Sequence, residues 1–364
     1  MAAPVIEADA VVIGAGPVGL FQVFQLGLHE VQAHVIDALP YAGGQCMELY
    51  ADKPIYDIPG TPVTTGRGLT QSLLQQIAPF QAQMHFSQLV ESVTRLEDGR
   101  LHLVTDAGTT FITKALFVAA GVGAFVPRKP AVPELEPFEK RQVHYPHDAA
   151  LPEGSLQGAH VVVLGGDESA VTAALQAADT PVDAHRPASV TLIHRRDVFT
   201  GEPATLQQLD AARASGTIRV LAAQVTGCGT DGSRLNSLRV LTAEGTEISV
   251  DADHVLVRLG VSPKMGPIAD WGWTLERKQV PVSTETFQSE IPGIFAVGDI
   301  NFYPGKRKLI LSGFHEATLA TFAAMAFISP EKKVLLQYTT TSPRLHQLLG
   351  VGTQEKSSRQ NLKI

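Results

Sequence analysis

The chain has 364 residues, of which 44% are apolar and 18% charged, and its formal net charge is −7. This length suits two domains with separate cores, and the glycine-rich composition is typical of an α/β enzyme and excludes a fibrous or disordered protein. The negative net charge argues against general binding to nucleic acid, because such a surface repels phosphate backbones.

No segment predicts export or a membrane span. The N-terminus lacks the basic region and apolar core of a signal peptide, so we expect a cytoplasmic protein. The most apolar stretches, such as Ala115 to Val126, contain glycine and are shorter than the ~20 residues that a membrane helix requires. Cys46 and Cys228 lie too far apart for a metal or dithiol motif, and we expect no metal site.

The first predicted elements form a strand–helix–strand unit over residues 8–40, ADAVVIGAGPVGLFQVFQLGLHEVQAHVIDALP. Gly14, Gly16 and Gly19 fit the G-x-G-x-x-G pattern, in which glycines allow a tight turn, a close approach to a pyrophosphate and packing of the helix on the strand. Asp37 ends the second strand, where a carboxylate accepts hydrogen bonds from an adenosine ribose. This order predicts a dinucleotide site, without deciding between FAD and NAD.

The pattern repeats as HVVVLGGDESAVTAALQ at 160–176, followed by the strand-like SVTLIHRRD at 189–197. Arginines end the second strand, where the first unit has its acid, and this favours the 2′-phosphate of NADP over the hydroxyl of NAD. A solvated basic pair at the start of a loop is the alternative. The residues that we expect to bind NADPH are Gly165, Gly166, Ser169, His194, Arg195 and Arg196.

One residue disagrees with the second pattern. Asp167 stands at the middle glycine position, where the backbone and a pyrophosphate come close. A carboxylate there adds a negative charge facing phosphate, so we expect weakened but retained NADPH binding.

Near the C-terminus, IPGIFAVGDI at 291–300 resembles the second FAD signature of flavoproteins with two dinucleotide-binding domains, in which the Asp, here Asp299, holds the ribityl chain. The following KLILSGFHEATLATFAAMAF predicts a helix. Its N-terminus, near Gly313, would aim a positive dipole end at the flavin, although a packed alanine-rich helix would look the same.

Nearly the whole chain resembles the thioredoxin-reductase-like, or type 2, ferredoxin–NADP reductases. The resemblance rests on VVIGAGPVGLF, GGQCMELYADKPIYDIPG, AAGVGAFVPRKP, HRRD and IPGIFAVGDINFYPGKRKLILSGFHEA. It implies an α/β fold of two three-layer, Rossmann-like domains. An FAD domain of residues 1–122 and 287–364 would enclose an NADPH domain of residues 123–286, with crossovers at the prolines of 127–137 and around Pro281.

The resemblance also implies the roles of single residues. Asp37 would bind the adenosine ribose and Asp299 the ribityl chain, and no acid–base residue is required. The other implied FAD contacts are Gln45 near the flavin, Tyr50 stacked on one ring face, Val90 at the adenine, Phe125 beside the flavin, Tyr338 over the other ring face and Thr341 nearest the ring. Tyr50 and Phe125 would also suit a plain core. Two departures fall in the NADPH domain: Asp167 replaces a glycine, and Thr200 an arginine.

The implied activity is electron transfer between NADPH and ferredoxin or flavodoxin through FAD, in a homodimer. Thioredoxin reduction is excluded, because it needs a C-x-x-C pair that the sequence lacks. Arg128, Lys129 and the run Lys306–Lys308 form either a basic rim for an acidic partner or a solvated loop. Two alternatives are a low-molecular-weight disulfide reductase or oxidase, and a flavin-binding sensor with an impaired NADPH site.

Overall fold

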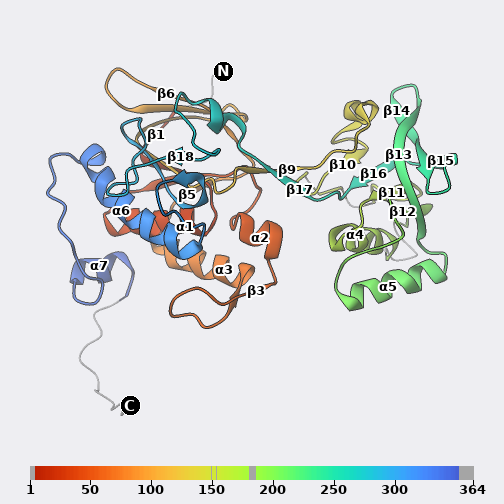
Figure 1. Ribbon diagram of the computed structural model, residues 1–364, viewed down its shortest axis with the longest axis horizontal. Helices are drawn as coiled ribbons and strands as arrows, with labels where there is room; N and C mark the ends of the chain where they lie inside the picture. Colours follow the sequence, from red (N-terminus) through yellow and green to blue (C-terminus); the bar gives the residue numbers. More distant parts are fainter. Residues whose placement is uncertain (1–4, 149, 153, 180–185, 352–364) are drawn as a thin grey trace, which may run out of the picture. The chain divides into compact units, whose positions relative to one another are not determined.

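The computed structural model describes residues 5–148, 150–152, 154–179 and 186–351. It divides into two compact units, Met1–Phe125 with Pro263–Ile364, and Val126–Ser262 (Figure 1). Residues 1–4 and 352–364, which we assigned to the FAD domain, lie outside the described part.

The first unit is built on a mainly parallel sheet. Its strands follow the order β5 (Gln83–His85), β2 (Ala33–Ile36), β1 (Val5–Ile13), β8 (Thr110–Val118), β7 (Leu101–Thr105) and β6 (Val90–Arg95), and β19 (Ile294–Ala296) pairs with β8. The centre of the sheet is covered on both faces, which explains the continuous apolar run Ala10–Ile13 in β1. One register determines the site: Phe295 of β19 lies opposite Phe117 of β8, so the two strands end together.

Helices cover one face of this sheet. They are α1 (Pro17–Leu28), α3 (Gly66–Ile77) and α6 (Ile310–Ile328), which lie side by side (Figure 1). The other face packs against the segment that contains Ile268, Trp271, Trp273 and Val280. The short elements of this unit are α2 (Gln45–Tyr50), β3 (Pro54–Ile55), β4 (Thr64–Thr65), β18 (Val280–Pro281), β20 (Asn301–Phe302), α7 (Pro343–Leu348) and the 3₁₀ turns Ala78–Phe80, Gly266–Asp270 and Gly298–Ile300.

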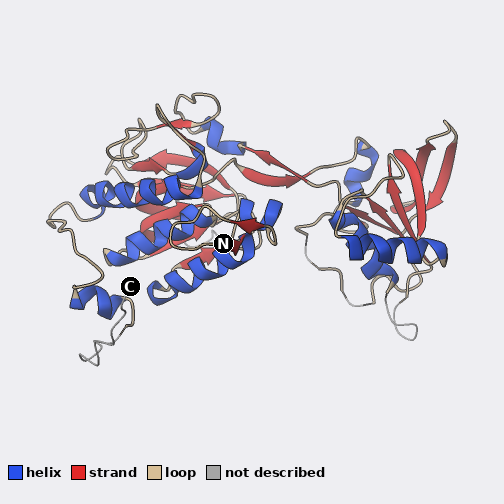
Figure 2. Cartoon of the chain, turned by 60° about the horizontal axis from the view of Figure 1, so that its bottom comes forward, coloured by secondary structure: helices blue, strands red, loops and turns tan. Residues whose placement is uncertain are grey.

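The second unit repeats the plan. Its strand order is β10 (Val143–His144), β16 (His254–Val257), β11 (His160–Leu164), β12 (Ser189–His194), β13 (Arg219–Asp231), β14 (Arg234–Thr242) and β15 (Glu247–Asp251). Helices α4 (Glu168–Ala178) and α5 (Pro203–Ala214) pack on one face (Figure 2). On the other face the antiparallel β14 and β15 contribute to a core with the 3₁₀ turn Pro133–Phe138. The two sheets confirm the predicted α/β fold.

The chain leaves the first unit in β9 (Ala124–Pro127) and returns in β17 (Val261–Lys264), and these strands pair with each other. The return therefore comes well before Pro281, where we placed it. Residues 263–286 belong to the first unit because Trp271, Trp273 and Val280 are buried against its sheet.

Among the described helices, α6 is the one long and apolar enough to cross a membrane, with a mean hydropathy of 1.2. Here it is a core helix. Ala317, Ala320 and Ala324 are fully buried, and Gln22 of α1 donates a hydrogen bond to Thr321 Oγ1 at 2.6 Å.

Candidate dinucleotide sites

The first site lies where adjacent parallel strands of the first unit end. Gly14 follows β1, Asp37 follows β2, Ala119 follows β8 and Asp299 comes shortly after β19. The carboxyl ends of parallel strands meet at one edge of a sheet, which is where open α/β sheets bind ligands.

The glycine loop is shaped by close contacts. Gly14 has φ +105°, and a Cβ there would lie 2.4 Å from the carbonyl oxygen of Ala119; a Cβ on Gly19 would lie 1.8 Å from that of Gly14. No other residue fits at either position without a backbone shift. Gly16 has nothing within 4 Å of its Cβ position, so its backbone is open to a ligand. Helix α1 starts here without a side-chain cap, which leaves its first N–H groups available to an anion.

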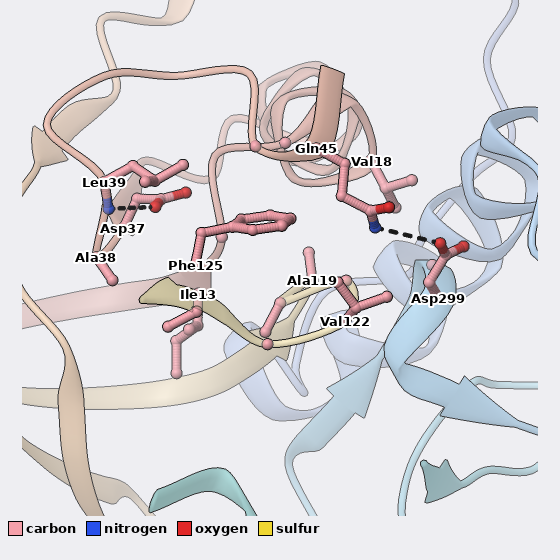
Figure 3. Close-up of a pocket in the computed structure, with 18 of the residues that line it drawn as sticks. Ile13, Val18, Asp37, Ala38, Leu39, Gln45, Ala119, Val122, Phe125 and Asp299 are labelled. Atoms are coloured by element: carbon pink, nitrogen blue, oxygen red, sulfur yellow. Dashed lines mark hydrogen bonds between the residues drawn. The ribbon is translucent and has the colours of Figure 1, made fainter. Parts of the chain in front are cut away.

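Asp37 is fixed to this loop. Its carboxylate accepts a hydrogen bond from the backbone N–H group of Ala15 at 2.6 Å. It accepts another from the backbone N–H group of Leu39 at 2.8 Å (Figure 3). Burial raises the pKa of the Asp37 carboxyl, and the two N–H donors partly oppose that shift. The carboxylate keeps lone pairs for ribose hydroxyls.

An elongated pocket runs from Asp37 to Asp299. Apolar side chains, including Ile13 and Phe125, line its middle, and Gln45 Nε2 donates to Asp299 Oδ2 at 3.3 Å at the far end (Figure 3). Carboxylates at both ends and an open glycine loop between them fit the two polyol groups and the pyrophosphate of FAD. The predicted FAD residues that line the pocket are Gly14, Gly16, Asp37, Gln45, Tyr50, Val90, Phe125 and Asp299, and Gly19 lies beneath the loop.

Cys46 is suited to packing rather than redox chemistry. It is 1% exposed, and its Sγ lies 3.7 Å from the Tyr50 hydroxyl. Burial raises the pKa of the Cys46 thiol, which keeps it protonated and unreactive at neutral pH. Cys228 belongs to the other unit and is also a free cysteine, so neither cysteine is part of a disulfide.

Within one chain, the C-terminal residues Tyr338 and Thr341 do not reach the pocket. Tyr338 is 65% exposed, and neither it nor Thr341 lines the pocket. An ion pair joins Arg344 of α7 to Glu30, just past the end of α1 that is remote from the glycine loop. The flavin-facing roles of Tyr338 and Thr341 therefore stay predictions.

The second glycine loop has the same tight geometry. A Cβ on Gly165 would lie 2.1 Å from the carbonyl oxygen of Arg258, and one on Gly166 would lie 2.5 Å from the His194 ring. His194 Nδ1 lies 2.9 Å from the carbonyl oxygen of Arg196 and 3.1 Å from that of Val198. Carbonyls only accept, so this nitrogen carries the proton and closes the turn after β12.

This turn presents Arg195 and Arg196 to solvent. Both are exposed, and within the described residues neither has an ion-pair partner, whereas the nearby Asp197 is held by Arg213. The two guanidinium groups are therefore available to a 2′-phosphate. Ser169 is also exposed, in the first turn of α4.

Asp167 has a structural role that the glycine pattern did not predict. It is the N-cap of α4, and its Oδ1 accepts from the Ala170 N–H at 3.1 Å. The carboxylate thus occupies a donor that a pyrophosphate would otherwise use. Thr200, the second departure, lies beside it: its N–H donates to the carbonyl oxygen of Gly166 at 2.9 Å.

Arg258, which the sequence analysis missed, follows β16 at the same edge. Its guanidinium donates to the carbonyl oxygens of His144 at 3.3 Å and Val257 at 2.9 Å. Burial lowers the pKa of Arg258, and the carboxylates of Asp148 and Asp167 oppose this shift. Arg258 therefore places a cation that partly offsets the charge of Asp167.

We expect Asp167→Gly to tighten NADPH binding several-fold, because it removes a negative charge and frees the Ala170 N–H. Glycine is an acceptable N-cap, so stability should fall by only a few tenths of a kcal/mol. Asp167→Asn separates the effect of the charge from that of the cap: it keeps the cap, removes the charge and should also tighten NADPH binding. The dissociation constant can be measured by titrating each variant with NADP⁺, and unchanged affinity in both would contradict this account of the loop.

Within the described residues, no group of three or more His, Cys, Asp or Glu side chains is placed to hold a metal ion.

The pocket is also lined by Met265, Ile268, Lys308 and Ile310, none of which the sequence analysis assigned to the FAD site. The first two lie in the segment that we assigned to the other domain.

The chain matches a known family and is similar to several known proteins. Residues 8–323 match the family model described as pyridine nucleotide-disulphide oxidoreductase. The chain is 56% identical to the ferredoxin–NADP reductase of Paracidovorax citrulli, over 96% of this chain and 98% of that protein. It is 50% identical to ferredoxin–NADP reductase 2 of Cupriavidus necator, over 95% and 91%. The crystal structure of Lactococcus lactis thioredoxin reductase has the same fold, with a TM-score of 0.54, 23% identity and coverage of 89% of this chain and 99% of that one.

Proposed function

The chain belongs to the pyridine nucleotide-disulphide oxidoreductase family and, within it, to the ferredoxin–NADP reductases, and on this premise we propose that it transfers electrons between NADPH and ferredoxin or flavodoxin through bound FAD. The observation that carries the proposal is a chain with two dinucleotide-type sites but no dithiol to receive electrons. FAD, when bound, supplies the link between a two-electron donor and one-electron acceptors.

The residues of the chain bind and orient the two nucleotides. In the first unit the Gly14–Gly19 loop would hold the FAD pyrophosphate, Asp37 and Asp299 its two polyol groups, and Tyr50 one face of the ring. In the second unit the Gly165–Gly166 loop and the arginine pair would hold NADPH. The remaining proposed contacts are Gln45, Val90, Phe125, Tyr338 and Thr341 for FAD, and Ser169 and His194 for NADPH.

The basic rim that we considered for an acidic partner is smaller than the sequence suggested. The side chain of Lys306 is 5% exposed and paired with Glu316, and Lys129 pairs with Glu139 in the other unit. Arg307 and Lys308 are exposed, and Lys308 also lines the FAD pocket. These two cations support an approach of an acidic carrier near the flavin.

We further propose a cytoplasmic homodimer. Three large apolar side chains near the C-terminus, Leu335, Leu336 and Tyr338, are 61 to 65% exposed, and a partner subunit would cover such a run. Light scattering of the holoenzyme tests the dimer.

The acceptor is tested by supplying the holoenzyme and NADPH with a ferredoxin, a flavodoxin, a low-molecular-weight disulfide or oxygen alone. We expect rapid reduction of the protein carriers and slow turnover with the other two. Fast reduction of the disulfide, with slow reduction of both carriers, would instead support the disulfide reductase.

A further inference from the structure

Among the described residues of the first unit, the carboxylate of Glu316 is fully buried and lies outside the pocket itself. Glu316 of α6 is 0% exposed, and its carboxylate accepts four hydrogen bonds. The donors are the Gly298 N–H at 2.7 Å, Asn301 Nδ2 at 2.8 Å, the Tyr303 hydroxyl at 2.9 Å and Lys306 Nζ at 2.5 Å. The side chain of Lys306 is itself 5% exposed, so the two charged side chains of the ion pair are both buried.

A buried pair of this kind is weak evidence of a stabilising role. Desolvation of two charges offsets much of their attraction, and apolar residues of similar volume often stabilise a fold equally well. The contacts of the pair therefore point to a role other than stability.

The pair is attached to the loop that carries Asp299. Glu316 holds the N–H of Gly298, and Asn301 Nδ2 bridges Glu316 and the carbonyl oxygen of Ala296 at 2.9 Å. From the other side, Gln279 Nε2 donates to the carbonyl oxygen of Asp299 at 3.0 Å. The backbone is thus fixed on both sides of the carboxylate that enters the FAD pocket.

The charges around Lys306 connect it with the pocket. Burial lowers the pKa of its ammonium group, the carboxylates of Glu316 and Asp299 oppose this shift, and Lys308 adds to the lowering. Two of these groups, Asp299 and Lys308, line the pocket. Changing the charge of Lys306 or Glu316 would therefore change the electrostatic potential at the cofactor.

We propose that Glu316 and Lys306 are positioning residues of the FAD site: Glu316 fixes the Gly298–Asp299 loop for the cofactor, and the Lys306 cation balances Glu316 so that reduction of the flavin, which adds negative charge, is not opposed. The inference rests on the proposed function only in requiring that FAD binds in this pocket.

The test compares Glu316→Gln, Lys306→Met and the double variant as holoenzymes. The flavin midpoint potential, measured by dithionite titration with a reference dye, should rise in Glu316→Gln, which leaves an unbalanced cation, and fall in Lys306→Met, which leaves an unbalanced anion. The double variant should return close to the wild type. Each single change should also weaken FAD binding to the apoprotein about tenfold or more, because one buried charge loses its partner.

Asp98→Asn and Arg100→Met, which break an exposed ion pair of the same unit, are the controls and should change neither quantity. If the charge variants do not fold, Tyr303→Phe takes their place in the test. It removes one hydrogen bond to Glu316, keeps the packing against Phe287 and should weaken FAD binding mildly. Unchanged FAD affinity in this variant would then overturn the proposal.

Lower thermal stability with unchanged potentials, or shifts of the same sign in both single variants, would likewise overturn it. None of these measurements uses NADPH or ferredoxin, so their failure is distinct from a failure of the proposed function.

Discussion

Replacing Arg195 and Arg196 together by alanine should raise the KM for NADPH by about a hundredfold and leave the KM for NADH within about twofold. Each exposed guanidinium can make a charge-assisted hydrogen bond to the 2′-phosphate, worth about 1.5–3 kcal/mol, and about 1.4 kcal/mol corresponds to a factor of ten. NADH lacks this phosphate and loses nothing. Steady-state kinetics with both nucleotides measure the change in preference.

Arg213→Ala is the matched control for the arginine pair. Arg213 is exposed in the same unit, but both of its terminal nitrogens are engaged by Asp197 at 2.8 and 2.9 Å. This variant should not change the ratio of the two KM values. An equal rise of KM for NADPH and NADH in the double variant would mean that the arginines do not bind the 2′-phosphate.

Asp299→Ala should lose most of its FAD during purification. The carboxylate lies in the pocket just after β19 and holds Gln45, so its removal deletes a charged acceptor and releases a neighbour that also lines the pocket. Loss of hydrogen bonds to a charged group costs about 1.5–3 kcal/mol each, which predicts an affinity at least about tenfold lower. Reconstitution of the apoprotein with FAD, followed by flavin fluorescence, measures the loss.

The Asp299 variant should also melt at a lower temperature unless FAD is in excess, because a ligand that binds only the folded state stabilises it. Asp270→Ala is the control, since Asp270 is an exposed carboxylate of the same unit and does not line the pocket. Full FAD content in Asp299→Ala would remove Asp299 from the site.

The features predictable from the sequence are those built by short stretches of chain. The glycine loops, Asp37 and the arginine pair lie within strand–helix–strand units, whose local order determines their geometry. The cap formed by Asp167 was also readable, since Asp directly before a helix is a preferred N-cap.

Long-range packing decided the rest. The position where the chain returns to the first unit depends on the pairing of β9 with β17 and on the burial of Trp271 and Trp273. No local sequence pattern predicts either feature. Lys306 reads as one of three surface cations, and only the fold shows it buried against Glu316. No local motif surrounds the C-terminal aromatic Tyr338, and within a single chain this residue does not line the pocket.

The proposed function requires NADPH to deliver electrons to FAD bound in the first unit. Anaerobic mixing of the holoenzyme with NADPH, and separately with NADH, tests it by the visible absorbance of the flavin. We predict fast bleaching by NADPH, slow bleaching by NADH, and recovery of the oxidised spectrum on addition of oxidised ferredoxin. Absence of bleaching by either nucleotide, with FAD still bound, would contradict the reductase and favour a flavin-binding sensor whose second site is disabled.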